Sequence, residues 1–124
     1  MRKTIIVLLA CSLFAGVNRL EAQSLQHTAW KFYVESLHDT LTMHIGVDTT
    51  FSTSSSGEMI VRSLFRTAGD TVRLRDIDGQ YPCMDGEGVY RYVIDGDRMN
   101  FIQVTDPCEG RGNALRDCKF IKVK

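Results

Sequence analysis

The chain has 124 residues, and its 15 Lys and Arg balance its 15 Asp and Glu. This length suits one small domain and leaves no room for a multidomain enzyme. The basic residues are scattered among acidic ones, so the chain lacks the basic patch with which proteins bind nucleic acid. We therefore expect no nucleic-acid partner.

The first 22 residues, MRKTIIVLLACSLFAGVNRLEA, have the pattern of a secretory signal peptide. Arg2 and Lys3 precede an apolar run from Thr4 to Val17, and Ala22 is a small residue at which cleavage can occur. The apolar run is too short to span a bilayer. We expect a signal peptide at residues 1–22, an exported domain at residues 23–124 and no stable membrane insertion.

An alternative is that Leu8-Leu9-Ala10-Cys11 is the lipobox of a bacterial lipoprotein, with lipid anchoring through Cys11. It is less favoured because Cys11 lies inside the apolar run instead of at its end. The signal segment holds three of the 15 basic and one of the 15 acidic residues, so the exported domain keeps 12 basic and 14 acidic residues, a formal charge of −2.

The exported domain shows strand signals almost throughout. Apolar and polar residues alternate with period two, as in Trp30-Lys31-Phe32, which is typical of a half-buried strand. The expected strands are residues 30–35, 41–47, 48–53, 58–66, 71–77, 88–94, 98–105 and 119–123.

The connections between these strands are short and contain no long helical pattern, which disfavours parallel crossovers. The sequence therefore predicts an all-β fold, an antiparallel up-and-down meander of about eight strands. Closing the first strand against the last into a small barrel removes both exposed edges. A barrel of this size has an interior that either fills with side chains or holds one small ligand.

The hairpin over residues 88–105 predicts a particular register. If Asp95-Gly96 forms a two-residue turn, Tyr92 lies opposite Met99 and Tyr90 opposite Phe101, on one apolar face. The same count, continued outward, places Cys83 opposite Cys108.

Three cysteines remain after export, Cys83, Cys108 and Cys118, in a compartment where disulfides persist. We expect a Cys83–Cys108 bond, with Cys118 as the competing partner. Closing a loop of this length stabilises the fold by ~3.5 kcal/mol, which is a sufficient reason for the bond.

A reactive thiol is the alternative role for this region. Asp106 can cap a short helix with Pro107 at its first position and Glu109 completing a capping box, and a cysteine at a helix N-terminus favours the thiolate. Redox chemistry at Cys108 or Cys118 is less favoured, because the exported domain has no Cys-x-x-Cys pair and two glycines, Gly110 and Gly112, weaken the helix.

Several segments of the second half resemble the C-terminal half of small, exported, lipocalin-like bacterial proteins. They are Gly88-Val89-Tyr90-Arg91-Tyr92, Gly96-Asp97-Arg98-Met99-Asn100-Phe101, Asp106-Pro107-Cys108-Glu109-Gly110-Arg111 and Ala114-Leu115. Trp30 is similar to the tryptophan that opens the first strand of such barrels. The resemblance implies an eight-stranded calycin-type barrel that takes a small apolar ligand, with Arg111 at the closing end.

The candidate ligand-binding residues are those expected to face the barrel interior, together with this arginine: Trp30, Phe32, Tyr90, Tyr92, Met99, Phe101 and Arg111. The competing interpretation is that the apolar side chains only fill the core and that Arg111 is structural, bonding carbonyls or stacking on an aromatic ring. A second function class is an envelope protein-interaction module such as a protease inhibitor, which requires a protruding segment, for example residues 23–28.

Catalytic patterns are missing from the sequence. His27, His38 and His44 do not share a spacing that places two on one strand face, and Asp76-Ile77-Asp78-Gly79 lacks the remaining ligands of a calcium loop. No phosphate-binding glycine loop or nucleophile elbow is present. We expect no enzyme activity, no metal and no cofactor.

Overall fold

A computed structural model of the chain describes residues 24–116 and 118–124. The predicted signal peptide, with Cys11, and Gln23 lie outside these residues. The elements in chain order are β1 (Thr28–Val34), η1 (Glu35–Leu37), β2 (Asp39–Ile45), β3 (Thr49–Thr53), β4 (Met59–Ala68), β5 (Thr71–Gly79), β6 (Gly88–Asp95), β7 (Arg98–Thr105), α1 (Glu109–Arg116) and β8 (Phe120–Lys122).

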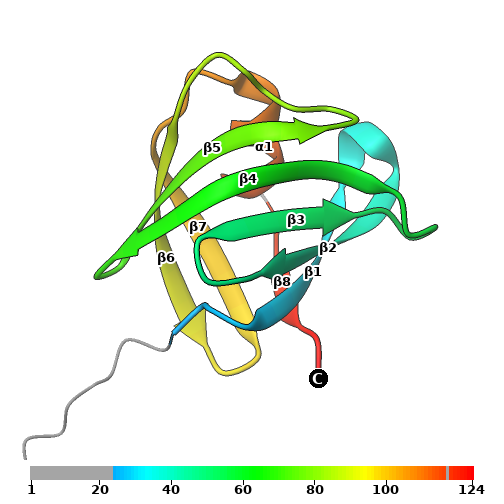
Figure 1. Ribbon diagram of the computed structural model, residues 1–124. Helices are drawn as coiled ribbons and strands as arrows, with labels where there is room; N and C mark the ends of the chain where they lie inside the picture. The colour runs from blue at the N-terminus through cyan, green and yellow to red at the C-terminus, as the bar shows by residue number, and fades with distance from the viewer. Residues whose placement is uncertain (1–23, 117) are drawn as a thin grey trace, which may run out of the picture.

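The eight strands form a closed antiparallel barrel (Figure 1). Each strand pairs with its neighbour in the sequence, and β1 closes the barrel by pairing with β8 through Trp30 and Lys31. This confirms the predicted all-β meander and the predicted closure of first strand on last. In the part of the chain that is described, no helix has the length and apolar character needed to cross a membrane.

Alternation along each strand sorts the side chains between interior and solvent. In β5, Val72, Leu74 and Asp76 are buried whereas Arg73 and Arg75 are exposed. Successive side chains of a strand point to opposite faces of the sheet, so the inward set here includes a carboxylate.

One half of the barrel is filled by large side chains. Trp30, Met99 and Phe120 are at most 1% exposed, and the Phe120 ring lies 4.9 Å from the ring of Phe101, edge to face. Trp30 Nε1 donates a hydrogen bond of 2.8 Å to Thr28 Oγ1, which satisfies its one polar group. The half of the barrel around Trp30, Met99 and Phe120 is therefore a close-packed core.

The other end of the barrel is surrounded by non-strand segments. The β5–β6 loop (residues 80–87) and α1 lie at the end opposite the β6–β7 turn (Figure 1). The loop is joined to the segment before α1 by the Cys83–Cys108 disulfide, whose Cα atoms are 6.2 Å apart. The predicted cysteine pair is therefore confirmed.

The predicted register of the β6–β7 hairpin is wrong, because the turn lies one residue later than the predicted Asp95-Gly96. The turn residues are Gly96 and Asp97, so Tyr92 pairs with Phe101 and Met99 pairs with Ile94. Gly96 has φ of 59°, and a positive φ at the first of two turn residues is the pattern of a type II′ turn, in which glycine is preferred there.

The predicted faces of the hairpin are nevertheless correct. Moving the turn by one residue moves the partner of each β6 residue by two positions along β7, from Met99 to Phe101 for Tyr92. Because side chains alternate with period two, a shift of two positions leaves every side chain on its face. The β6–β7 ladder ends at the pair Val89 and Thr105, so the disulfide lies outside the paired residues of this hairpin. The predicted cysteine pair is thus correct, although the strand register from which it was predicted differs from the observed one.

The predicted capping by Asp106 is confirmed in part. Its Oδ1 accepts a hydrogen bond of 2.8 Å from the backbone N–H of Cys108. However, α1 begins at Glu109, two residues beyond Pro107, and continues for eight residues despite its two glycines. The buried side of the helix contributes Leu115 to the core.

Candidate binding site in the open half of the barrel

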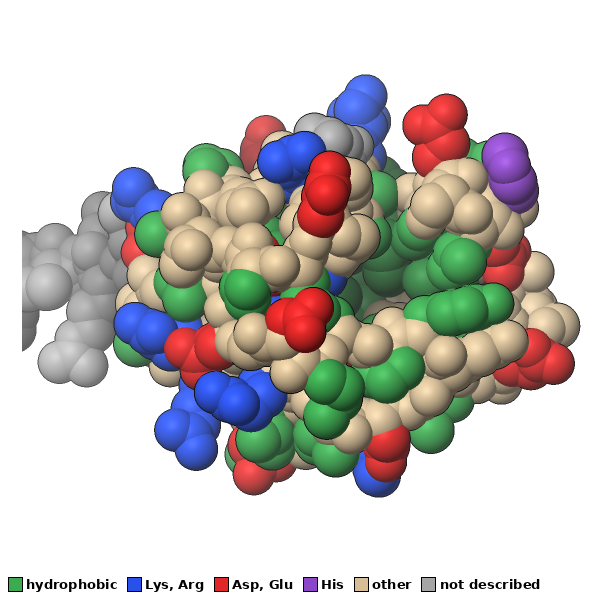
Figure 2. Space-filling model, turned by 90° about the horizontal axis from the view of Figure 1, so that it is seen from above, with side chains coloured by type: hydrophobic (Ala, Val, Ile, Leu, Met, Phe, Trp, Pro, Cys, Tyr) green, Lys and Arg blue, Asp and Glu red, His purple; other side chains and the backbone are tan. Residues whose placement is uncertain are grey.

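The half of the barrel next to α1 encloses a cavity of about 810 Å³. Its size falls within the range of about 300–1,000 Å³ that is typical of small-molecule sites. Seen from this end, the molecule is hollowed, with hydrophobic side chains around the depression (Figure 2). The apolar lining from the strands comprises Phe32, Val34, Leu41, Met43, Ile60, Val61 and Leu74.

The non-strand segments complete the rim of this cavity. Leu37 from η1, Tyr81 and Met84 from the β5–β6 loop, and Leu115 from α1 line it. Tyr81 and Met84 are 59% and 69% exposed, which is unusual for side chains of their size and places apolar surface at the entrance.

One wall of the cavity is polar and is built by three neighbouring strands. Thr50 on β3 pairs with Ser63 on β4, and Ser63 pairs with Asp76 on β5. Paired residues of an antiparallel ladder share a face, so the three side chains form a row across the wall. All three residues are buried and line the cavity. Ser52, two residues after Thr50 on the same face of β3, is also buried and lines the cavity. We call Thr50, Ser52, Ser63 and Asp76 the polar row.

Two hydroxyls of the polar row are unused by the fold. Ser63 Oγ donates a hydrogen bond of 2.7 Å to Asp76 Oδ1. The hydroxyls of Thr50 and Ser52, each in a residue only 3% exposed, make no hydrogen bond to the described part of the chain. Neither oxygen is among the buried polar atoms that lack a partner in the described residues, so both are open to the cavity and available to a molecule in it.

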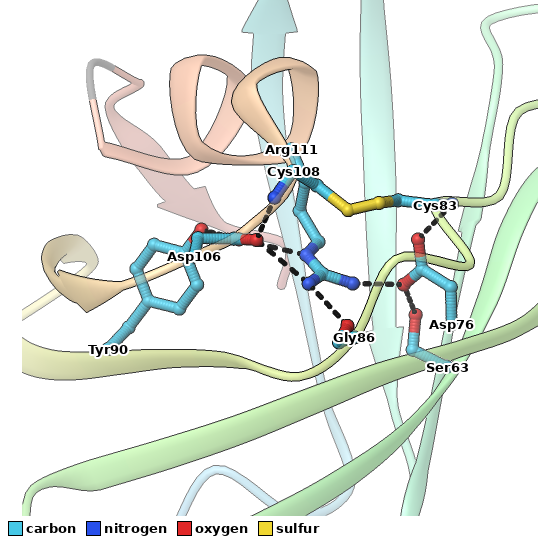
Figure 3. The surroundings of a disulfide bond; sticks show 8 residues. All are labelled: Ser63, Asp76, Cys83, Gly86, Tyr90, Asp106, Cys108 and Arg111. Atoms are coloured by element: carbon cyan, nitrogen blue, oxygen red, sulfur yellow. Dashed lines mark hydrogen bonds and ion pairs between the residues drawn. A yellow bond between two sulfur atoms is a disulfide. The ribbon is translucent and has the colours of Figure 1, made fainter.

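A buried ionic cluster adjoins the row (Figure 3). Arg111 from α1 donates to Asp106 with Nε at 2.9 Å and Nη2 at 2.8 Å, and Nη2 also donates to the Gly86 carbonyl at 2.8 Å. Its Nη1 lies 3.4 Å from Asp76 Oδ1 and makes no hydrogen bond to the residues that the structure describes. The Arg111 side chain is only 8% exposed.

Hydrogen bonds hold the two carboxylates of this cluster in place. Asp76 Oδ2 accepts from the backbone N–H of Cys83 at 2.7 Å, which ties β5 to the disulfide. The Tyr90 hydroxyl donates to Asp106 Oδ2. Helix α1, strand β5 and the β5–β6 loop therefore meet at one set of charged hydrogen bonds, the strong class of such bonds.

The environment shifts the pKa values of this cluster. Burial and the negative charge of Asp106 raise the pKa of Tyr90, so its hydroxyl stays a donor at physiological pH. Burial works to raise the pKa of Asp106, but the hydrogen bonds from Arg111, Tyr90 and the Cys108 backbone, together with the charge of Arg111, leave that pKa below its ordinary value. For Arg111 burial works to lower the guanidinium pKa, but the hydrogen bonds to Asp106 and the negative charges of Asp76 and Asp106 raise it above its ordinary value.

The cluster does not balance its charge. Among the described residues, Asp76 and Asp106 face a single guanidinium, that of Arg111, which makes bidentate hydrogen bonds to Asp106. Asp85 and Glu109 also line the cavity. The residues that line it, Asp76, Asp85, Glu109 and Arg111, thus carry three formal negative charges and one positive.

The predicted ligand-binding residues divide between the two halves of the barrel. Phe32 and Arg111 line the cavity. The remaining five do not line it: Trp30, Tyr90, Met99 and Phe101 are buried in the packed core, and Tyr92 is partly buried with its hydroxyl donating to the Gly69 carbonyl at 3.0 Å. Arg111 donates to one carbonyl, as its structural interpretation expects, and also to the carboxylate of Asp106, and it forms an ion pair with Asp76.

The polar row was missed in the sequence, although a signal was present. Alternation from Val72 through Leu74 continues to Asp76, which places this carboxylate on the inward face of β5. The same continuation on β3 places Thr50 and Ser52 inward. Polar residues at inward positions of a predicted barrel therefore indicate a lined cavity.

The histidines and cysteines occupy separate parts of the structure. His44 is on β2, where its ring stacks on Phe51 with centroids 4.5 Å apart. Cys83, Asp85 and Cys108 bring three potential metal ligands within 4.8 Å, but the two sulfurs are bonded to each other and are not thiolates. The Cys118 thiol donates to the Tyr33 carbonyl at 2.8 Å.

We compared the chain with known proteins. No protein-family model, no curated protein sequence and no solved structure matches the chain. The architecture itself, eight antiparallel strands in a closed meander, is consistent with a lipocalin-like fold.

Proposed function

We propose that the protein is an exported, lipocalin-like β-barrel of calycin type that binds a small ligand with a substantial apolar or aromatic part. The observation that carries this proposal is the cavity of about 810 Å³ in one half of a barrel whose other half is packed. A barrel that served only as a scaffold would gain stability by filling this space, because side chains that line a cavity lose contacts.

Export is supported by the N-terminal signal pattern and by the disulfide, which fits an oxidising compartment. The resemblance to bacterial lipocalin-like proteins favours the periplasm or the medium as the destination. Lipid anchoring through Cys11 remains the less favoured alternative.

The geometry favours ligand binding over protease inhibition through the N-terminal segment. Leu25 is 1% exposed, and the His27 backbone N–H donates to the Ile45 carbonyl at 2.9 Å. Residues 24–28 are thus held against the barrel, whereas the inhibitor hypothesis requires a protruding segment.

Binding of a neutral fluorescent aromatic probe such as N-phenyl-1-naphthylamine tests the proposal. We expect saturable fluorescence enhancement with the exported domain and its loss in Leu41→Trp, which places a large ring in the cavity. The control is Ile102→Trp, on the outer face of β7, where the residue is 53% exposed. Both variants are first checked for cooperative unfolding. No saturable binding by the folded wild type, or equal binding by folded Leu41→Trp, would contradict the proposal.

A further inference from the structure

We propose that the ligand is an amphipathic amine: an apolar body with a protonated amino group directed at the polar row. This inference rests on the proposed function, because it assumes that the cavity holds a ligand. It is carried by two independent features of the cavity, the excess negative charge and the two unused hydroxyls.

The charge of the ionic cluster selects a cation. Arg111 has its two strongest bonds to Asp106, so the carboxylate of Asp76 is opposed only by Nη1 at 3.4 Å. A buried charge without full compensation is costly, and a ligand of opposite charge removes that cost. An ammonium group next to Asp76 would bring the charge of Asp76, Asp106, Arg111 and ligand to zero.

The unused hydroxyls supply acceptors for such a group. An ammonium carries three N–H donors and no acceptor. Thr50 and Ser52 lie on the strand that flanks Ser63, the hydrogen-bond partner of Asp76, and both line the cavity. The polar row can thus offer a carboxylate and hydroxyl oxygens to one amino group.

Arg111 is a poor receptor for an anionic headgroup, although it lines the cavity. Its Nε and Nη2 atoms already donate to Asp106 and to the Gly86 carbonyl. Nη1 has no hydrogen bond, but this atom is buried and faces Asp76. A carboxylate ligand would therefore have to displace an existing carboxylate or lie against one.

The charge at the entrance of the cavity also favours a cationic ligand. Asp85 and Glu109 line the cavity from the β5–β6 loop and α1, and both are exposed. Acidic side chains also appear on the surface around the hollow in Figure 2. Clefts lined by one sign of charge attract ligands of the opposite sign and raise their local concentration.

Three probes with one tail and different headgroups test the inference: decylamine, decanol and decanoate. Each is titrated, below its micelle concentration at pH 7, against the complex of the wild-type domain with N-phenyl-1-naphthylamine. We expect decylamine to displace the fluorophore at a concentration about tenfold or more below decanol, because a hydrogen bond to a charged group exceeds a neutral one by this order. Decanoate should be the weakest.

Two variants locate the preference. Asp76→Asn should abolish the advantage of decylamine over decanol. Since this substitution also alters the bonds to Ser63 and Cys83, the double variant Thr50→Val/Ser52→Ala provides a second test that breaks no side-chain hydrogen bond among residues 24–116 and 118–124. It should weaken decylamine by about tenfold and decanol by less, because a hydrogen bond from a charged group is the stronger one, while leaving N-phenyl-1-naphthylamine binding unchanged.

The outcomes separate the two proposals. If the wild type fails to bind the neutral fluorophore, the proposed function itself fails. If the fluorophore binds but the three headgroups displace it equally, or decanoate displaces it best, the cavity binds ligands without the amine preference and only this inference is overturned.

Discussion

Replacing Arg111 by methionine should destabilise the protein far more than replacing an arginine of a surface ion pair. The matched control is Arg91→Met, whose guanidinium donates to Asp70 Oδ2 at 2.8 and 3.1 Å, with both side chains more than half exposed. Both substitutions remove one guanidinium that donates two hydrogen bonds to a single carboxylate. They differ in burial, since the side chains of Arg111 and Asp106 are 8% and 0% exposed.

The expected cost of Arg111→Met is about 3–5 kcal/mol, the range for removing one partner of a buried pair. Three charged hydrogen bonds are lost, two to Asp106 and one to the Gly86 carbonyl, and Asp76 loses its nearest cation. Two carboxylates are then left in the interior without a counter-charge. Arg91→Met should leave stability close to that of the wild type, because water and salt screen the exposed pair.

Equilibrium urea unfolding of the three proteins measures both effects. The pH dependence supplies a second readout: Asp106, whose pKa is lowered in the folded state, contributes stability that is present above its unfolded pKa near 3.8 and is lost as the pH falls through the folded value. Arg111 is a main cause of that lowered pKa, so the difference in unfolding free energy between wild type and Arg111→Met should narrow as the pH falls below 3.8 and through the folded pKa of Asp106. A loss in Arg111→Met no larger than in Arg91→Met would refute this reasoning.

Further predictions concern the disulfide, the core and one glycine. The double variant Cys83→Ser/Cys108→Ser should lose ~3.5 kcal/mol in urea unfolding, and dithiothreitol should then have no further effect, since the bond closes a separation of 25 residues. Phe120→Ala should cost about 3–5 kcal/mol because this ring is fully buried, whereas Ile121→Ala, at 44% exposure, should change the melting temperature little; equal effects would contradict the packing described. Gly79→Ala should lower the melting temperature sharply or prevent folding, because φ is 124° and a Cβ atom would lie 2.5 Å from a backbone oxygen of β4; an unchanged melting temperature would exclude that geometry.

Much of the fold was predictable because its signals are local. Alternation with period two identifies a strand and its two faces without reference to any other segment, and all eight expected strands are present within a few residues of their predicted bounds. Short connections then leave an antiparallel meander as the arrangement. The Gly96 turn was misplaced because Asp95-Gly96 and Gly96-Asp97 both have turn composition, and the choice between them depends on pairing along the whole hairpin.

The candidate site was much harder to predict. Phe32 and Trp30 lie two residues apart on the same face of β1, yet only Phe32 lines the cavity. Nothing in the local pattern separates them, since both are apolar and inward-facing. Arg111 and Asp76 are 35 positions apart in the chain, and their approach depends on how α1 packs over the end of the barrel.

By itself the sequence determined the fold class, the number of strands, the inward set of side chains and the pair of cysteines that bond. Only the tertiary structure decided where along the barrel axis the interior is packed and where it is hollow. The reason is that a side chain's face follows from its own strand, whereas the volume left in the interior depends on side chains from every strand and on the helix at its end. Thr50, Ser63 and Asp76 come to lie side by side in the polar row only after three strands have paired in register.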